Sequence, residues 1–475
     1  MAYQPQRIAA DAVERILRAV GVAGCITEPS ALEPYLAEWR GLYRGATPLV
    51  VRPATVGEVS AVVTICAETR TGVVPQGGNT GLCGGAVPSR DGDQIVMSLE
   101  RLNRIRSIDP DNFTITVDGG CVLADVQRAA ADADRQFPLS LASEGSCTIG
   151  GNLATNAGGV GVVRHGTMRD LALGLEVVLP DGRVCSGLKG LRKDTSGYDL
   201  KQVFIGSEGT LGVITGAVLR LSPQPRSVAT AWLALRDLNA AVELLASARA
   251  MSGDALTAYE ILSRPGLDFV LRHIPGARDP LEGRHDWYAL VELAGAEEDA
   301  AGAALERLLA AALAEGTVAD GAVAASGTQR KDFWRLRESM SEAQQKEGAS
   351  IKHDIAVPVA AVPAFVRAAT SAVEARLPGI RVVAFGHAGD GNVHFNLSQP
   401  PEMDRSLFLA RWPEFNRIVH DIVIEFGGTI SAEHGIGRLK REELVRYADP
   451  IALELMRTLK HALDPHNIMN PGKVL

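Results

Sequence analysis

Four segments rich in glycine or in small and polar residues, between residues 75 and 214, place the strongest constraint on the fold of this chain. The first, residues 75–85, follows a strand-like run at residues 72–75 and has five glycines within nine residues. Glycine tolerates positive φ and leaves backbone N–H groups exposed, as a loop that holds a diphosphate requires. The glycines follow neither the Gly-x-Gly-x-x-Gly order nor the phosphate loop of nucleotide triphosphatases, so a nicotinamide Rossmann site is disfavoured.

The other three segments are residues 141–159, 193–199 and 206–214. Small residues and amides dominate the longest of them, so its backbone can approach a large planar ligand closely. Turns alone would not account for four such segments inside one domain. The region is therefore predicted to bind a large cofactor.

The length and the local patterns predict more than one domain. A chain of 475 residues exceeds the size at which single hydrophobic cores usually split. Residues 48–75 have the pattern strand, helix, strand, which is typical of an α/β or α+β domain, and the sequence Ser-Pro-Gln-Pro at residues 222–225 indicates a linker. Beyond it, alanine-rich helical stretches alternate with strand-like runs, which favours an antiparallel sheet covered by helices.

We therefore expect an α+β protein in three parts. The first is a cofactor-binding domain, residues 1–222, with a helical lead-in to residue 45 and its core in residues 46–222. The second is a substrate domain, residues 223–425, and the third is a C-terminal segment, residues 426–475, with a helix near residues 451–463.

Composition excludes several classes of function. The formal net charge of −8 argues against a surface that binds nucleic acid. The N-terminal residues lack the apolar core of a secretory signal, and no apolar run approaches the roughly 18 residues of a membrane span. The six cysteines all lie in the first 185 residues without a Cys-x-x-Cys pair, so we expect reduced thiols and a cytoplasmic location.

Histidines and a glutamate gather in two glycine-bracketed motifs. Gly-His-Ala-Gly-Asp-Gly-Asn-Val-His, residues 386–394, reads as two strands joined by a tight turn that can bring His387 and His394 together. Ser-Ala-Glu-His-Gly-Ile-Gly, residues 431–437, adds Glu433 and His434. Two histidines and a carboxylate with open positions are the arrangement of a catalytic metal, and zinc, manganese and iron all suit it. A single histidine in a strand is usually structural, but the joint pattern predicts a metal site.

These motifs carry a family resemblance. The glycine-rich segments resemble the FAD domain of the vanillyl-alcohol-oxidase/p-cresol-methylhydroxylase superfamily (a PCMH-type domain). The two histidine motifs resemble its D-lactate/D-2-hydroxyglutarate dehydrogenase branch, and the likeness extends from about residue 48 to the end. It implies oxidation of a small D-2-hydroxy acid, with hydride transfer from C2 to flavin N5.

The resemblance also implies which residues hold FAD. The diphosphate loop would comprise Gln76, Gly77, Gly78, Asn79, Thr80 and Gly81. The flavin and its ribityl chain would lie against Ser143, Glu144, Gly145, Thr148, Gly151, Asn152 and Thr155. The ribose–adenine side would meet Glu208, Gly209 and Ile214, and Asn470 would return to the flavin ring. Because Asn79 stands where a histidine that attaches FAD would be expected, we predict non-covalent FAD.

The remaining roles follow from the same branch and from the chemistry of the side chains. His387, His394 and Glu433 are the predicted ligands of a divalent metal, with Zn²⁺ implied by the resemblance. A metal that binds the hydroxyl and the C1 carboxylate lowers the hydroxyl pKa. His434, adjacent to a ligand, is the predicted general base, because the pKa of imidazole lies near operating pH.

Four further residues are expected to select the substrate. Arg337 and Ser341 are four apart on a predicted helix and so share a face, and Lys352 follows in a strand-like run at residues 350–355. With Asn396 they offer enough donors for a second carboxylate, as in the 2-hydroxyglutarate dehydrogenases that this chain resembles. That branch often has threonine at the position of Ser341, and Arg337 and Lys352 could instead be surface charges.

Three functions stay open at this point. The first is a D-2-hydroxyglutarate dehydrogenase, the second is a D-lactate or glycolate dehydrogenase of the same build, and the third is a flavin-binding subunit of a larger assembly. The absence of a nicotinamide motif leaves an electron-transfer flavoprotein or a quinone as the expected electron acceptor. A homodimer is the expected oligomer.

Overall fold

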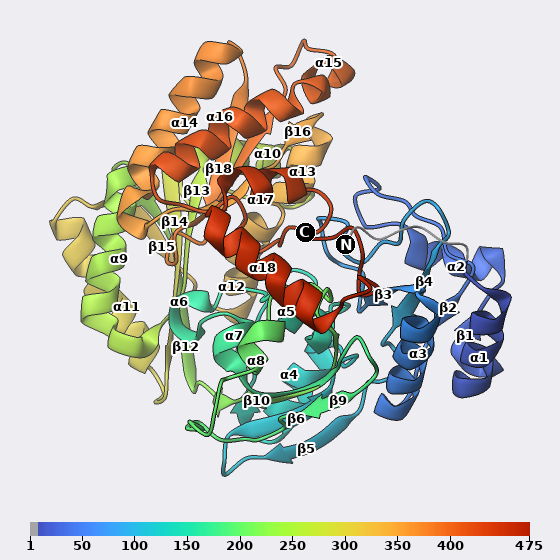
Figure 1. Cartoon of the computed structure of the whole chain (residues 1–475). Coiled ribbons are helices and arrows are strands. Elements are labelled where there is room, and N and C mark those ends of the chain that lie inside the picture. The colour runs from blue at the N-terminus through green and yellow to red at the C-terminus, as the bar shows by residue number, and fades with distance from the viewer. Residues whose placement is uncertain (1–7) are drawn as a thin grey trace. The chain divides into compact units, whose positions relative to one another are not determined.

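The structure is a computed structural model and describes residues 8–475, so the first seven residues of the predicted helical lead-in lie outside it. The chain divides into two compact units (Figure 1). The first consists of the residues up to Gly158, Thr167–Gln224 and Glu433–Leu475. The second consists of Gly159–Gly166 and Pro225–Ala432. The sequence-based boundaries were residues 222 and 425.

The first unit begins with a small four-stranded sheet in the order β1-β2-β4-β3. Its strands are β1 (Cys25–Ile26), β2 (Val50–Val51), β4 (Gln94–Ser98) and β3 (Gly72–Gln76). Strands β2 and β3 both pair in parallel with β4, as expected of a strand–helix–strand unit. The linking helix α3 (Val56–Thr69) begins at Thr55, whose side chain accepts a hydrogen bond from the N–H of Glu58.

Helices α1 (Ala10–Val20) and α3 pack together over a core of buried aliphatic side chains. Helix α2 (Pro29–Leu36) packs through Leu32 and Leu36 on a smaller cluster with Val50 and Val96. This packing fixes the carboxyl end of β3, which leads directly into the glycine-rich loop that starts at Gln76.

A second sheet of the first unit is antiparallel, in the order β5-β6-β10-β8-β9. Its strands are β5 (Ile105–Asp109), β6 (Thr114–Asp118), β10 (Val213–Arg220), β8 (Ala172–Val178) and β9 (Val184–Ser186). The helical segments along it are α4 (Leu123–Asp132), α5 (Ile149–Ala154), α7 (Met168–Leu171) and α8 (Lys201–Phe204), and a short ribbon joins β7 (Arg135–Gln136) to β11 (Ser222–Pro223). Helix α5 packs on β10, which brings the second glycine-rich segment over this sheet.

The C-terminal segment completes the first sheet. After α17 (Arg441–Tyr447) and α18 (Pro450–Leu463) the chain runs parallel to β3. The N–H of Val73 donates to the carbonyl of Ile468 at 2.8 Å, and the N–H of Asn470 donates to the carbonyl of Val73 at 2.7 Å. These bonds place Asn470 beside the end of β3.

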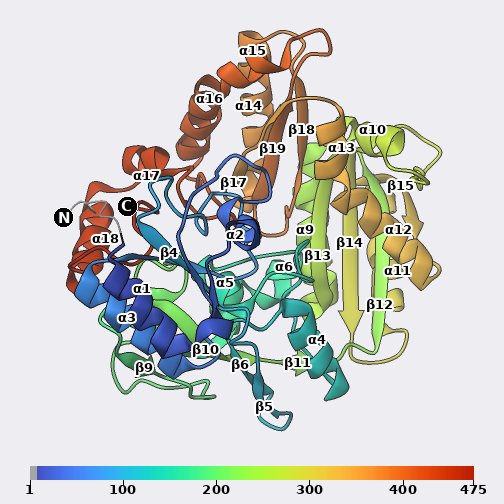
Figure 2. The same cartoon turned by 90° about the vertical axis from the view of Figure 1, so that its right-hand side faces the viewer.

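The second unit contains a large antiparallel sheet in the order β15-β12-β14-β13-β18-β19-β16, with β17 also paired to β19. Figure 2 shows the long strands β12, β14 and β13 side by side. The strands are β12 (Ser227–Leu235), β13 (Leu256–Ser263), β14 (Trp287–Gly295), β15 (Val318–Val323), β16 (Ser350–Ile351), β17 (Asp354–Ala356), β18 (Arg381–Gly386) and β19 (Asn392–Ser398).

Both faces of this sheet are covered by helices. In β12, Leu233 and Leu235 join one core while Trp232 and Ala234 join the other, since successive side chains point to opposite faces. The first core is shared with α9 (Leu238–Ser252), α11 (Ala300–Ala314), α14 (Val362–Arg376), α15 (Arg405–Ala410) and α16 (Trp412–Glu425), and the second with α10 (Arg264–His273), α12 (Gly327–Glu338) and α13 (Met340–Lys346). Helix α6 (Val162–His165) packs on β13.

The predicted α+β class and the antiparallel sheet of the second part are confirmed, while two local predictions are wrong. The continuous helix predicted through Arg337 and Ser341 is two helices, which meet at Ser339. The strand predicted over residues 350–355 is interrupted, because Lys352 and His353 belong to neither β16 nor β17. The Nδ1 atom of His353 lies 2.8 Å from the carbonyl oxygen of Phe395. In the described part of the chain, no helix has the length and apolar character needed to span a membrane.

Phe365 tests the larger core of the second unit. The ring of Phe365 is fully buried and meets Phe395 and Phe426 edge-on, with centroid distances of 5.6 and 6.3 Å. Phe365→Ala should lower the free energy of unfolding by about 3–5 kcal/mol, because it removes this burial and leaves a cavity. The exposed Leu407→Ala should change it by less than about 0.5 kcal/mol in urea unfolding followed by circular dichroism. Equal effects of the two substitutions would contradict this packing.

Candidate active site

A pocket in the first unit gathers most of the predicted cofactor residues. Of those residues, the lining contains Gln76, Gly77, Gly78, Asn79, Thr80, Gly81, Thr148, Gly151, Asn152, Thr155, Glu208, Gly209, Ile214 and Asn470. Among the described residues, the predicted Ser143, Glu144 and Gly145 lie outside this lining. The Glu144 carboxylate instead accepts a hydrogen bond from Gln127 at 2.9 Å. Residues 193–199, one of the four glycine-rich segments, form an exposed loop away from the lining.

Two loops meet in this pocket with no room for side chains. A Cβ on Gly78 would lie 1.8 Å from the carbonyl oxygen of Ser146, and a Cβ on Gly77 would lie 2.2 Å from Oγ1 of Thr148. Glycine is therefore required by close backbone approach at both positions. This packing aims the backbone of the first loop into the pocket.

Three polar atoms of the lining fit a bound cofactor. Asn79 Oδ1, Thr148 Oγ1 and Asn470 Oδ1 are buried and have no hydrogen-bond partner among the described residues. An unsatisfied buried polar atom costs free energy, so such atoms indicate a missing partner. The polar ribityl and diphosphate groups of FAD would supply partners here, and the residues present therefore fit this cofactor.

Two residues of the pocket lining, Asn79 and Cys147, bear on whether FAD could be attached covalently. Asn79 holds its side-chain amide on the carbonyl of Ala37 at 2.8 Å. Burial raises the pKa of the Cys147 thiol above its usual value, against a weaker opposing contribution from Asn152. A thiol with a raised pKa is a poor nucleophile. These contacts favour non-covalent FAD.

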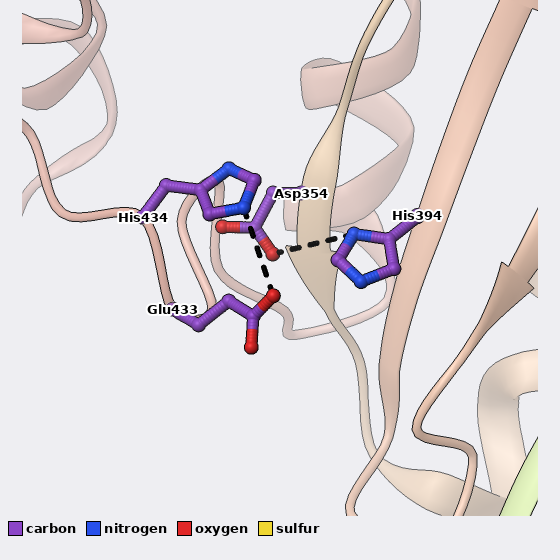
Figure 3. A group of neighbouring side chains, drawn as sticks. All are labelled: Asp354, His394, Glu433 and His434. Atoms are coloured by element: carbon purple, nitrogen blue, oxygen red, sulfur yellow. Dashed lines mark ion pairs between the residues drawn. The ribbon is translucent and has the colours of Figure 1, made fainter. Parts of the chain in front are cut away.

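His434, the predicted base, lines the same pocket. The carboxylate of Glu208 accepts hydrogen bonds from the N–H groups of Ile436 and Gly437 at 2.7 and 2.8 Å. Burial raises the pKa of Glu208, and the two backbone donors oppose this shift. Glu208 thus ties the segment that contains His434 to the pocket wall. The Nε2 atom of His434 lies 3.6 Å from Oε1 of Glu433 (Figure 3).

In the second unit, the hairpin of β18 and β19 brings His387 and His394 together. Their ring centroids are 5.7 Å apart, with the planes at 75°. Between the strands, the N–H of Asn392 donates to Asp390 Oδ1 at 3.1 Å and closes the tight turn. The side chains of the two predicted metal ligands of this unit are therefore neighbours.

A buried carboxylate joins this site to Arg337. Glu260 on β13 has no exposed surface, and its Oε1 lies 2.5 Å from Nδ1 of His387. Its Oε2 accepts from Nε of Arg337 at 2.6 Å. Burial alone would raise the pKa of Glu260, but the charges of Arg337 and His387 outweigh it and lower the pKa to about 2. The guanidinium of Arg337 also stacks on Phe385, 4.8 Å from the ring centroid.

Asp354 on β17 is a further acidic group beside the histidines. It pairs with His394 across the sheet, and the distance from Asp354 Oδ1 to His394 Nδ1 is 3.9 Å (Figure 3). The N–H of Ala432 donates to the carbonyl of Asp354 at 3.3 Å. Ala432 is the last residue of the second unit along the chain, and the predicted ligand Glu433 belongs to the first.

The four predicted substrate residues all lie in the second unit. Arg337 is 8% exposed, so the interpretation of this residue as a surface charge is wrong. Lys352 is half-buried between β16 and β17, and Ser341 is half-buried on α13. Asn396 is buried and donates from Nδ2 to the side-chain oxygen of Gln344 at 3.0 Å. Its side-chain amide is thus already engaged within the unit.

Sequence reasoning missed Glu260 and Asp354. Each is the one charged side chain of its strand, within the apolar runs Leu-Thr-Ala-Tyr-Glu-Ile-Leu-Ser and Asp-Ile-Ala. A charge in such a run signals a buried ion that needs a partner. The identity of that partner depends on strand order, which the sequence does not specify.

The tight contact at Gly78 predicts a loss of cofactor. Gly78→Ala should abolish the yellow colour of the purified protein, because its Cβ would push the first loop away from Ser146. Gly302→Ala, on α11 of the second unit, is the control, since a Cβ there meets no described atom within 4 Å. The measurement is the ratio of flavin to protein absorbance after gel filtration. Full flavin content in the Gly78 variant would contradict this assignment of the pocket.

Comparison with known proteins shows the family and the fold of the chain. Residues 47–187 match a profile described as FAD binding domain, and residues 224–474 match one described as FAD linked oxidases, C-terminal domain. Among solved structures, p-cresol methylhydroxylase with substrate bound has a TM-score of 0.76 at 18% identity, covering 100% of this chain and 98% of that one. An alkyldihydroxyacetonephosphate synthase has a TM-score of 0.75 at 17% identity, covering 99% of this chain and 86% of that one. These two likenesses show the fold.

Curated relatives are more similar in sequence. A mitochondrial D-2-hydroxyglutarate dehydrogenase of Arabidopsis thaliana is 37% identical, covering 96% of this chain and 80% of the relative. A D-2-hydroxyglutarate dehydrogenase of Xanthomonas citri is 39% identical, covering 94% of this chain and 93% of the relative. A D-2-hydroxyglutarate–pyruvate transhydrogenase of Saccharomyces cerevisiae is 33% identical, covering 94% and 90%. Because the first of these is named as mitochondrial, the expected cytoplasmic location stays a prediction.

The matched profiles, the fold and the relatives agree with the resemblance seen in the glycine-rich and histidine motifs. The chain therefore belongs to the family of FAD-linked oxidases and is an FAD-dependent oxidoreductase.

Proposed function

We propose that this enzyme oxidises D-2-hydroxyglutarate to 2-oxoglutarate. The observation that carries the proposal is the position of His434, which lines the flavin pocket and directly follows the acidic Glu433. The names of the relatives in A. thaliana and X. citri, at 37% and 39% identity, support this substrate and its D configuration.

The proposed reaction needs a base and a hydride acceptor. When bound, FAD would accept the hydride from C2, and a divalent metal would act as a Lewis acid on the C2 hydroxyl. His434 would take the hydroxyl proton at a ring nitrogen, for which neutral imidazole is suited near pH 7. The products are 2-oxoglutarate, reduced flavin and a proton on His434, so electrons and protons balance.

The residues near β17 and β19 fit a divalent cation. His387 and His394 offer neighbouring imidazole rings, and the motif at residues 431–437 supplies the carboxylate of Glu433. Imidazole with carboxylate suits Zn²⁺ and several other first-row ions, and we expect Zn²⁺. Glu260 would orient His387 through its Nδ1, as carboxylates behind metal-bound histidines do.

Arg337, Ser341, Lys352 and Asn396 form the proposed pocket for the second carboxylate. Arg337 is held by Glu260 and Phe385, so its guanidinium is oriented before substrate binds. A fixed fork of N–H donors favours a planar carboxylate. We further propose that an electron-transfer flavoprotein or a quinone accepts the electrons of the reduced flavin. We also propose that the protein is a homodimer.

Lys352 tests the choice of substrate. Turnover with a dye acceptor should be faster for D-2-hydroxyglutarate than for D-lactate or glycolate. Lys352→Met should lower the ratio of kcat/KM for D-2-hydroxyglutarate to that for D-lactate by about 10- to 100-fold, because a charge-assisted hydrogen bond is lost. The control is Lys346→Met on α13. The ammonium group of Lys346 pairs with Glu342 at 2.7 Å. A higher rate with D-lactate, unaffected by Lys352→Met, would indicate a monocarboxylate enzyme.

Glu260 is the proposed positioning residue, and a second buried glutamate of the same sheet provides its control. Glu260→Gln should weaken metal binding by about 10- to 100-fold, since His387 loses its anionic partner. Glu292 on β14 is 7% exposed and pairs with Arg330 at 2.8 Å. Glu292→Gln should destabilise the unit without changing metal affinity.

The measurement for this pair is the metal content of each variant after dialysis against graded concentrations of a chelator. Equal retention of metal in the Glu260 variant and the wild type would remove the positioning role. Equal loss in both glutamate variants would indicate a general effect on stability.

A further inference from the structure

The first unit contains a second cavity, separate from the flavin pocket. This cleft of about 860 Å³ lies among residues 89–94, α17, α18 and the chain after Asn467. No described residue lines both cavities. Its volume is within the range of small-molecule sites, roughly 300–1,000 Å³.

The cleft has more basic than acidic side chains, although the whole chain has a net charge of −8. Five lining residues are lysine or arginine and three are aspartate. One basic residue, Lys460, is structural: its Nζ lies 2.5 Å from Asp464 and donates to the carbonyls of Thr210 and Met469 at 2.8 Å. Setting that pair aside, four cations face two aspartates, and Nη2 of Arg441 already donates to the backbone oxygen of Leu475 at 2.6 Å. The four are Arg438, Arg441, Arg457 and Lys473.

Lys473 is the most constrained of these cations. It is 3% exposed, and burial lowers its pKa to about 7, with Arg438 and Arg441 adding to this shift and Asp93 opposing it. Taking an ammonium group out of water beside two guanidinium groups is costly unless an anion offsets it. The buried Nε of Arg441 also has no hydrogen-bond partner among the described residues.

Two arginines add accessible donors to the cleft. Arg457 projects from α18 as an exposed residue. Arg438 stacks on Tyr43, 5.3 Å from the ring centroid, and donates to the carbonyl of Pro88 at 3.3 Å. Stacking fixes the plane of a guanidinium, and a fixed fork of donors suits an oxyanion.

We propose that this cleft is a binding site for a small molecule with a doubly charged oxyanion group, such as a phosphate ester. Lys473 and Arg441 would contact the anion from the buried side, and Arg438 and Arg457 would enclose it from the open side. The site belongs to the flavin-binding unit and is independent of the hydroxy-acid pocket, which is built from residues of the other unit.

Titration calorimetry of the FAD-loaded protein with inorganic phosphate tests this site, with chloride at equal ionic strength as the reference. The expected result is saturable binding of one phosphate per chain. Lys473→Met and Arg457→Gln should each weaken it about tenfold, because each removes a charged donor. Arg457 is exposed, so its variant keeps the test valid if the Lys473 variant fails to fold.

Two control variants separate the cleft from other sites. Arg446→Gln replaces an exposed arginine of α17 outside the cleft and should keep the phosphate affinity within twofold of the wild type. Lys352→Met, in the proposed substrate pocket, should also keep it, so the result does not depend on which hydroxy acid is oxidised. Phosphate binding no stronger than that of chloride, or binding unaffected by the Arg457 and Lys473 variants, would overturn the proposal.

Discussion

The cost of burying a carboxylate is the constraint on which the candidate site depends. Glu260 has no contact with solvent and stays ionised, because Arg337 and His387 both lie within hydrogen-bond distance. Removing one partner of a buried ion pair typically costs about 3–5 kcal/mol, so the three side chains hold one another in place. One anion therefore fixes both the proposed substrate arginine and a proposed metal ligand.

In the flavin-binding unit, backbone contacts hold the candidate cofactor residues in place. Its two cofactor loops approach so closely at Gly77 and Gly78 that their positions are set before any ligand arrives. Glu208 then ties Ile436 and Gly437 to the pocket, and the Asn470 amide donates to the carbonyls of Gly85 and Glu208 at 3.0 and 2.7 Å. The C-terminal segment thus brings His434 to the pocket wall, although it lies more than 200 residues beyond the loops.

Local sequence patterns predicted much of this arrangement. The strand, helix and strand expected over residues 48–75 appear as β2, α3 and β3, because their signals lie within one run of chain. The proximity of His387 and His394 agrees with the tight turn expected at Gly-Asp-Gly, which joins two paired strands. The glycine-rich loops predicted the cofactor pocket for the same local reason, except for residues 143–145 and 193–199, which lie outside its lining.

What the sequence could not predict depends on contacts between distant strands. The partners of Glu260 lie 77 and 127 residues away: Arg337 is on α12, and His387 follows β18, the strand that pairs with β13. Because the helical periodicity of the sequence continues through Ser339, it could not predict the break between α12 and α13. Likewise, the cationic cleft assembles from segments near residues 43, 90, 440 and 473 that carry no shared motif.

The most direct test of the proposed chemistry is anaerobic mixing of the FAD-loaded, metal-replete enzyme with D-2-hydroxyglutarate, while the oxidised-flavin absorbance is followed. Rapid loss of this absorbance is predicted. In His434→Gln the rate should fall by about 10²- to 10⁴-fold, the usual contribution of a general base, with FAD still bound. An unchanged rate in that variant would exclude His434 as the base. No loss of absorbance with D-2-hydroxyglutarate in the wild type would contradict the proposed function itself.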